Sequence, residues 1–314
     1  MLLSGRICIV TGASRGIGKG IALQLGEAGA TVYITGRTLT ARPGDQLGGS
    51  LTDTASEIES RGGKCIPVQC DHSKDEDIAA FFERVKSEQN GRLDLLVNNA
   101  YAAVNAISEN LGKPFWEQPL SIWDTVNNVG LRNHYICTVF AAKMMVPRKQ
   151  GLIVNISSAG GLAYLFNVAY GIGKEALDRM AADCGVELKK HNVAVVSLWP
   201  GPVMTEHVDQ MLQTTKSEQR KKLFEGAESV EYAGKCIVAL AKDPNVMSKS
   251  GKVLMTPELG QEYNLRDIDG RVIDSMRQIN WLMARNPNTA WMQRWLPKFL
   301  RMPYWMFALK GSKF

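Results

Sequence analysis

Tyr170 and Lys174 lie four residues apart in a segment with helical periodicity, so both side chains are expected on one face of a helix. An ammonium group beside a phenol favours the phenolate and lowers a phenol pKa that is normally about 10. A tyrosine with such a lowered pKa can exchange a proton near neutral pH, as carbonyl chemistry requires. The same spacing also occurs on solvated helices, so the interpretation depends on the rest of the chain.

A glycine-rich loop, Thr-Gly-Ala-Ser-Arg-Gly-Ile-Gly at residues 11–18, follows the first apolar run and precedes a helical segment. Its glycines permit a tight turn and a close approach of the backbone to a pyrophosphate, which then lies at a helix N-terminus. The loop therefore predicts a dinucleotide site. The predicted phosphate-binding residues are Gly12, Ser14, Arg15, Gly16, Ile17 and Gly18.

The end of the second apolar run distinguishes the two nicotinamide cofactors. An NAD site usually has an acidic residue there, which binds the ribose hydroxyls. This chain has Gly36 and Arg37 instead, and Arg15 lies inside the glycine loop. Two guanidinium groups suit a 2′-phosphate, so we expect NADP(H) rather than NAD(H). The alternative is that Arg37 is a solvated loop residue.

Seven short, mostly apolar runs alternate with helical patterns along the 314 residues. This alternation predicts one doubly wound α/β (Rossmann) domain, with a parallel sheet of about seven strands and helices on both faces. The predicted strands are 7–11, 31–35, 64–69, 93–97, 151–157, 194–198 and 252–255. The predicted helices are 18–27, 50–61, 75–88, 122–145 and 169–190, and Ser50 or Thr52 is expected to cap the second.

The six cysteines are scattered without the spacing of a metal site, which indicates reduced thiols in a cytosolic protein and predicts no metal. The N-terminal residues run directly into the first strand and leave no room for a signal peptide. No stretch reaches the roughly 20 apolar residues of a membrane-spanning helix.

The net charge of +6 is concentrated at the C-terminus. From Arg277 onward there are seven basic residues and no acidic ones, so the remainder carries about −1. A nearly neutral body argues against a nucleic-acid partner. The tail also contains Trp281, Trp291, Trp295, Phe299, Tyr304, Trp305 and Phe307. Aromatic and basic residues together suit an anchor at a membrane interface, and packing on the core or on another subunit is the alternative.

With these features the chain resembles the short-chain dehydrogenase/reductase family over roughly residues 4–260. The resemblance rests on the loop at 11–18, Asp71, Asn-Asn-Ala at 98–100, Asn-Ile-Ser-Ser at 155–158, Tyr170, Lys174, and Pro-Gly-x-x-x-Thr at 200–205. A closer match to one group within the family is carried by residues 98–101, 127–132, 197–201, 267–270 and 312–314.

The resemblance implies a cofactor role for each matching residue. Asp71 is expected at the adenine edge, and Asn99 in the cofactor cleft, where it also steadies the sheet. Val203 and Thr205 are expected at the nicotinamide carboxamide. The same resemblance implies a catalytic domain over 1–270, with a substrate lid at about 202–230, and an extension over 271–314.

The resemblance also assigns the catalytic roles. Ser158 would hydrogen-bond the substrate oxygen, and Tyr170 would protonate it as hydride reaches the carbon. Lys174 would bind the nicotinamide ribose and lower the Tyr170 pKa. Ser157 is an alternative to Ser158, because the interval to Tyr170 is one residue shorter than usual.

Two positions depart from the family pattern. Gly130 stands where the family usually has a catalytic asparagine, whose side chain helps to position a water that relays protons to the lysine. Asn127 or Asn128 could substitute through a shifted water, or both could simply satisfy helix ends. Tyr101 stands where the family commonly has glycine, and packing is its expected use.

The expected function is therefore NADPH-dependent reduction of ketone or aldehyde carbonyls in hydrophobic substrates of steroid, retinoid or xenobiotic type. Apolar residues in the lid agree with such substrates. The alternatives are a non-catalytic NADPH-binding scaffold or sensor and a membrane-tethered lipid-binding protein. We expect a cytoplasmic protein that associates peripherally with the cytoplasmic face of the endoplasmic reticulum through its tail. A homo-oligomer is typical of the family, but the tail leaves the oligomeric state open.

Overall fold

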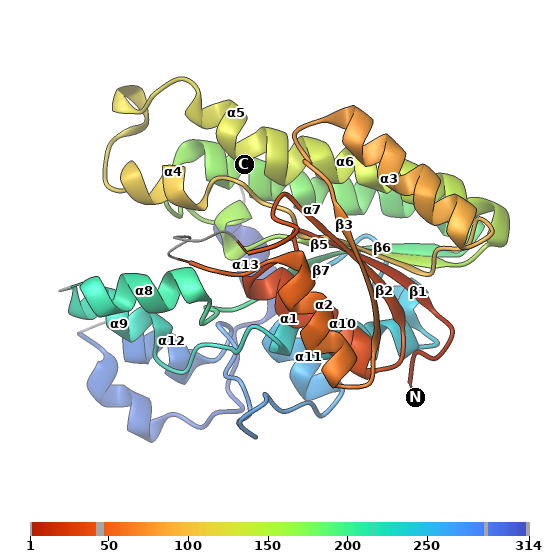
Figure 1. Cartoon of the computed structure of the whole chain (residues 1–314). Helices are drawn as coiled ribbons and strands as arrows, with labels where there is room; N and C mark the ends of the chain where they lie inside the picture. Colours follow the sequence, from red (N-terminus) through yellow and green to blue (C-terminus); the bar gives the residue numbers. More distant parts are fainter. Residues whose placement is uncertain (1, 42–46, 216, 286–287, 312–314) are drawn as a thin grey trace.

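The fold is built on one parallel sheet of seven strands in the order β3-β2-β1-β4-β5-β6-β7 (Figure 1). The computed structural model describes residues 2–41, 47–215, 217–285 and 288–311. The strands are β1 (Ile7–Thr11), β2 (Thr31–Gly36), β3 (Lys64–Gln69), β4 (Leu95–Asn98), β5 (Gly151–Ile156), β6 (Val193–Trp199) and β7 (Val253–Met255). The predicted doubly wound α/β class is confirmed, and the strand order reverses between β1 and β4. Ligands of such sheets bind beyond the carboxyl ends of the strands at this switch point.

Helices cover both faces of the sheet (Figure 1). In β1, Cys8 and Val10 point into one core and Ile7 and Ile9 into the other, as expected for a strand buried on both sides. The first core includes residues of α1, α2, α10 and α11, and the second includes residues of α3, α6 and α7. The helices are α1 (Gly16–Glu27), α2 (Leu51–Ser60), α3 (Asp75–Glu88), α4 (Val104–Glu109), α5 (Ile122–Asn127), α6 (Asn133–Met145), α7 (Val168–Leu188), α8 (Glu206–Thr214), α9 (Glu218–Phe224), α10 (Tyr232–Lys242), α11 (Thr256–Glu262), α12 (Ile279–Arg285) and α13 (Tyr304–Gly311).

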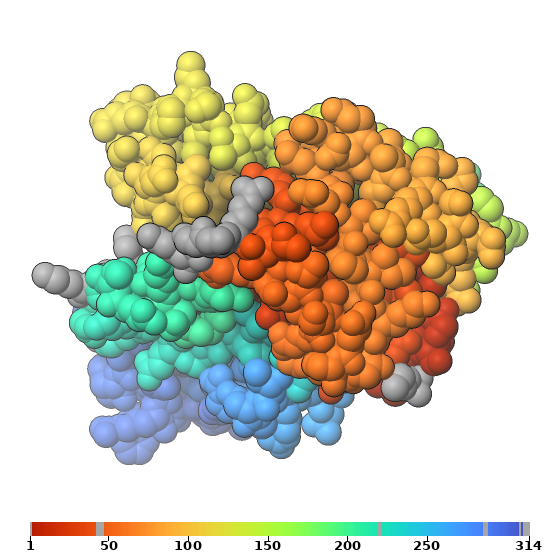
Figure 2. All heavy atoms as spheres, in the orientation of Figure 1, coloured from red at the N-terminus to blue at the C-terminus, as the bar shows by residue number. Residues whose placement is uncertain are grey.

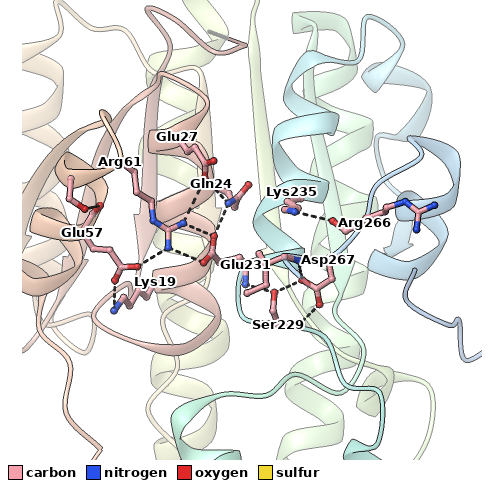
Figure 3. A network of polar contacts seen from close by, with 12 residues as sticks. Lys19, Gln24, Glu27, Glu57, Arg61, Ser229, Glu231, Lys235, Arg266 and Asp267 are labelled. Atoms are coloured by element: carbon pink, nitrogen blue, oxygen red, sulfur yellow. Dashed lines mark hydrogen bonds and ion pairs between the residues drawn. The ribbon is translucent and has the colours of Figure 1, made fainter. Parts of the chain in front are cut away.

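Polar contacts join α1, the end of α2 and the start of α10 (Figure 3). The buried Glu231 carboxylate, just before α10, accepts hydrogen bonds from Arg61 at 2.8 Å and from Gln24 of α1 at 2.7 Å. Lys19 of α1 pairs with Glu57 of α2 at 2.8 Å. Ser50 caps α2 by accepting a hydrogen bond from the backbone of that helix. These contacts hold α1, which begins at the glycine loop, against α2 and α10.

The predicted continuous helix over 122–145 is wrong. It is divided into α5 and α6 by a π-helical turn, Asn128–Arg132, in which Val129 and Gly130 leave helical geometry. Gly130 has φ +156°, and a Cβ there would lie 2.6 Å from the Tyr101 ring. The Gly130 N–H donates to Asn133 Oδ1 at 2.7 Å rather than to a helical carbonyl. The ring of Tyr101, a residue distant in sequence, therefore interrupts a segment whose local pattern is helical.

The base of the C-terminal extension packs on the core. Arg277 donates to Glu258 of α11 at 2.9 Å, and its guanidinium lies 3.6 Å from the centroid of the Tyr304 ring. Arg301 reaches the same carboxylate at 3.1 Å. No helix within the described ranges is long and apolar enough to span a bilayer. The tail residues 312–314 of the closer family match lie outside the described residues.

Candidate active site

Ser158 and Tyr170 meet where β5 ends and α7 begins. Asn167 caps α7 by accepting a hydrogen bond from the Tyr170 N–H at 2.8 Å, which fixes the tyrosine in the first turn. The Tyr170 hydroxyl lies 2.8 Å from Ser158 Oγ. One turn later the buried Lys174 donates from Nζ to Ile156 O at 3.1 Å. The structure thus brings together the three residues predicted to be catalytic.

The geometry distinguishes the two serines. Ser158 Oγ bonds the Tyr170 hydroxyl and also accepts from the Gly160 N–H at 2.9 Å. Ser157 is buried and donates from Oγ to the Lys174 carbonyl at 3.1 Å. Ser158 therefore faces the reactive phenol, whereas Ser157 supports the helix that carries Lys174.

The expected lowering of the Tyr170 pKa by Lys174 is not seen in the protein alone. Burial raises the pKa of the Tyr170 phenol, and the hydrogen bond to Ser158 offsets only part of this effect. Burial also lowers the Lys174 pKa to about 8, against the opposing charge of Asp178. Lys174 Nζ lies 5.8 Å from the centroid of the Tyr170 ring. Desolvation, rather than the charge of Lys174 on which the spacing argument rested, governs the Tyr170 pKa.

Asp178, one turn beyond Lys174, is a half-buried carboxylate that the sequence did not single out. It accepts hydrogen bonds from Ser197 Oγ at 2.5 Å and from Trp199 Nε1 at 3.0 Å. Burial raises its pKa to about 6 in spite of these bonds. Its i+4 spacing from Lys174 was visible in the sequence, but only the fold shows that β6 encloses it.

The glycine loop has the backbone geometry that a phosphate site needs. Gly12 and Gly16 have φ of +68° and +58°, a region that favours glycine. A Cβ on Gly12 would lie 2.7 Å from Ala100 Cα, and one on Gly18 would collide with the Asn99 amide. Asn99 Nδ2 donates to the Thr11 and Gly12 carbonyls at 2.9 Å each. Asn99 therefore holds the loop to the end of β4, as its predicted position in the cleft requires.

A carboxylate already occupies the N-terminal end of α1. Glu206, the first residue of α8, accepts from the Gly16 N–H at 3.0 Å. Thr205 caps α8 and packs beside Gly16. An anionic group bound to this N–H shows that the loop can receive the negative charge of a pyrophosphate. The residues present therefore fit a dinucleotide, whose phosphates would displace Glu206.

The remaining predicted loop residues surround this turn. Arg15 donates from Nη1 to Gly48 O at 3.1 Å, and Ile17 packs against the first core. The Ser14 carbonyl oxygen lies against Gly49, where a Cβ would approach it to 2.6 Å. These contacts join the glycine loop to the segment before α2.

Arg37 and Asp71 line one groove of about 600 Å³ beyond the ends of β2 and β3. Asp71 accepts from the Ser73 N–H and hydroxyl at 3.0 and 2.8 Å. Burial raises the Asp71 pKa, but these bonds and the Arg37 charge outweigh it and hold the pKa below its usual value. Arg37 is exposed, with its guanidinium available in the groove. The groove thus offers both a carboxylate and a cation at the predicted adenosine end of the cleft.

The segment predicted to form a lid, residues 202–230, follows β6 and leads back to α10. Val203 is buried and forms a single parallel bridge with Glu228, whereas Met204 and Leu223 are exposed. Figure 2 shows α8 and α9 (teal) directly above the C-terminal extension (blue) on the same side of the molecule. The lid is thus a surface layer that touches the glycine loop through Thr205 and Glu206. No group of His, Cys, Asp and Glu within the described ranges is placed to hold a metal ion.

Comparison with known proteins places these features in a family. A family model described as short chain dehydrogenase matches residues 6–216. The chain is 51% identical over 318 residues to dehydrogenase/reductase SDR family member 1 of Homo sapiens, with 99% of each chain covered. The Mus musculus protein of the same name is equally similar, at 51% identity and 99% coverage of both chains. This is the group to which the closer sequence match pointed.

Solved structures share the fold. A metagenomic short-chain oxidoreductase in complex with NADP has a TM-score of 0.63 and 29% identity, over 81% of this chain and 98% of that one. A 7 alpha-hydroxysteroid dehydrogenase with NADH and 7-oxo glycochenodeoxycholic acid has a TM-score of 0.68 at 23% identity, over 81% and 93%. The second similarity shows the fold alone.

Proposed function

Because the chain belongs to the short-chain dehydrogenase family of oxidoreductases, we propose that it reduces ketone or aldehyde carbonyls of hydrophobic substrates with NADPH. The observation that carries the proposal is the 2.8 Å contact between Ser158 Oγ and the Tyr170 hydroxyl. This contact places two proton-bearing oxygens at one point, where a single carbonyl oxygen can receive hydrogen bonds from both.

The side chains act in sequence on the substrate oxygen. The glycine loop would hold NADPH, which would supply the hydride. Ser158 donates a hydrogen bond to the carbonyl oxygen as negative charge develops there. Tyr170 transfers its hydroxyl proton to that oxygen and becomes a phenolate. The Lys174 ammonium, held by Ile156 O, stabilises the phenolate by its charge.

The preference for NADPH rests on Arg37. Its guanidinium lines the groove at the end of β2, where an NAD site would usually have a carboxylate. Changing Arg37→Asp should shift the preference toward NADH, because a carboxylate repels a 2′-phosphate and can accept from ribose hydroxyls. The measurement is the ratio of kcat/KM with NADPH to that with NADH. An unchanged ratio would remove Arg37 from the phosphate site.

Two other functions compete with this one: a scaffold that binds NADPH without turnover, and a lipid-binding protein tethered to a membrane. A scaffold needs no serine hydroxyl in contact with a half-buried phenol beside a buried lysine, so the Ser158, Tyr170 and Lys174 arrangement favours the enzyme. The deciding experiment is oxidation of NADPH with a panel of steroid, retinoid and aromatic ketones. Tight NADPH binding with no turnover on any of them would support the scaffold.

We also propose that the extension attaches the protein to the cytoplasmic face of the endoplasmic reticulum. Five of its seven aromatic side chains are exposed, with Trp295 at 71% and Trp305 at 62% exposure. The basic Arg294 and Lys298 lie among them. Such residues suit the boundary between lipid headgroups and acyl chains, whereas an extension that only covered the core would bury them.

A further inference from the structure

Buried polar atoms without partners gather around the break between α5 and α6. Within the described part of the chain, ten buried side-chain nitrogen or oxygen atoms have no hydrogen-bond partner. Seven of them surround the ends of β4 and β5 and this break: Asn98 Oδ1, Tyr101 OH, Asn127 Oδ1 and Nδ2, Asn133 Nδ2, His134 Nδ1 and Asn155 Nδ2. Buried polar groups are normally satisfied, by water if not by protein. Their concentration here indicates bound water inside the active-site wall.

Asn127 is the member of this group that faces the catalytic helix. It ends α5, is buried, and has both amide atoms unpaired. Its Oδ1 lies directly against Gly173 of α7, at a place that a Cβ on residue 173 would occupy. Only a glycine at residue 173 allows the Asn127 side chain to come this close to α7. Asn128, by contrast, is only half-buried.

Tyr101 closes the opposite side of the same region. Its ring covers Gly130, so residue 130 cannot carry a side chain into this space. The ring centroid lies 5.1 Å from Lys174 Nζ and 6.3 Å from the Tyr170 ring. The two departures from the family pattern, Tyr101 and Gly130, are therefore one structural feature.

Lys174 needs further partners in this region. An ammonium group has three N–H donors, and within the described residues Lys174 gives one hydrogen bond, to Ile156 O. A buried charge with unused donors is costly unless water completes its shell. The unpaired atoms nearby are suited to hold such water.

We propose that Asn127 is a positioning residue, which binds a buried water next to Lys174 and thereby resupplies the proton that Tyr170 gives to the substrate. The proposal rests on the proposed reductase function. Each reduction moves one proton from Tyr170 to the substrate oxygen and leaves a phenolate. One proton from solvent restores the phenol, and the water held by the Asn127 amide carries it inward. Tyr101, by filling the space above Gly130, confines this water to the Asn127 side.

The test compares Asn127→Leu with Asn127→Asp, and uses Asn128→Leu as the matched control. Leucine keeps the branching at Cγ and removes both polar atoms, so kcat should fall by about 10-fold or more. KM for the ketone and the dissociation constant for NADPH should change little, and the solvent deuterium isotope effect on kcat should rise. Asn128→Leu should behave like the wild type.

Asn127→Asp keeps the water acceptor and adds a negative charge near Lys174. It should retain more activity than Asn127→Leu and shift the pH profile of kcat toward higher pH, because a carboxylate raises the pKa of a nearby ammonium. If the leucine variant fails to fold, Asn127→Asp alone tests the role of Asn127. A purely structural asparagine would give Asn127→Asp no advantage in kcat over Asn127→Leu and would leave the solvent isotope effect at its wild-type value.

The outcomes separate the two proposals. An active wild type whose kcat, isotope effect and pH profile survive changes at Asn127 overturns the role of this residue alone. Equal losses in the Asn127 and Asn128 leucine variants overturn it as well. A wild type that binds NADPH but reduces no carbonyl compound overturns the proposed function, and the role of Asn127 with it.

Discussion

At the scale of single residues, the chemistry depends on which serine hydroxyl faces the Tyr170 phenol. Ser158 touches the Tyr170 phenol, and Ser157 only supports α7 through the Lys174 carbonyl. The sequence placed both serines at the end of a strand and favoured Ser158, with Ser157 as the alternative. Adjacent residues at a strand end point to opposite sides, and only the path of the chain into α7 shows which side holds the tyrosine.

Ser158→Ala should lower kcat for ketone reduction by about 10²-fold, because a donor to the developing oxyanion is lost. Ser157→Ala is the control and should leave kcat nearly unchanged while lowering stability slightly. Steady-state kinetics and thermal unfolding of both variants provide the check. If Ser157→Ala causes the larger loss of kcat, the assignment of the two serines is reversed.

Glu228 is expected to make stability depend on pH. Burial raises its pKa from 4.5 to about 7, although Thr256 and the Gly201 N–H donate to it. The folded protein thus binds more protons than the unfolded chain between these values, so stability falls as pH rises through this window. Glu228→Gln removes this effect and should be more stable than the wild type above pH 7, by on the order of 3 kcal/mol.

The check for Glu228 is chemical denaturation of both proteins at several pH values. The difference in free energy of unfolding should be small near pH 4.5 and grow toward pH 7. A difference that does not change with pH would show that Glu228 has an ordinary pKa in the folded protein.

At the scale of elements, strands were easier to predict than helix continuity. Runs such as Ile7–Thr11 are buried on both faces, so their apolar character is visible in a short window. The break at Gly130 depends on the ring of Tyr101, which follows a different strand. The raised Tyr170 pKa likewise depends on burial, which is a property of the assembled layers. Interactions between distant segments decided both features.

The lid helix α8 is expected to compete with the cofactor. Glu206 accepts a hydrogen bond from the Gly16 N–H, which a cofactor phosphate would need. Glu206→Gln should tighten NADPH binding by about 10-fold, because a charged hydrogen bond no longer has to be broken. Glu218→Gln on α9 makes the same charge change away from the loop and should have little effect.

The dissociation constants can be measured by quenching of tryptophan fluorescence or by calorimetry. Equal effects of the two lid substitutions would mean that only the overall charge matters. Weaker binding in the Glu206 variant would mean that this carboxylate supports the cofactor-bound lid.

At the scale of the whole molecule, a nearly neutral catalytic body carries a basic, aromatic extension. The base of the extension is held against α11 by ion pairs of Arg277 and Arg301 with Glu258. The exposed tryptophans lie beyond that attachment. A membrane at this surface would face the lid side of the cleft, through which apolar substrates would enter.

Vesicles containing anionic lipid should bind the wild type, with binding that weakens as salt increases. The double variant Trp295→Ser, Trp305→Ser should bind at least about 10-fold less tightly, because two exposed indole groups no longer enter the interface. Trp116→Ser, at an equally exposed position in the body, is the control. Sedimentation with vesicles measures all three, and a wild type that stays in the supernatant contradicts membrane attachment.

The proposed carbonyl reduction depends on Tyr170 as the proton donor. The most direct measurement is NADPH oxidation by the wild type and by Tyr170→Phe, with the most active ketone of the panel and with NADPH binding determined for both. We expect kcat to fall by about 10³-fold in the variant while NADPH affinity is nearly unchanged. Equal turnover by the two proteins, or equal inertness despite tight NADPH binding, would contradict it.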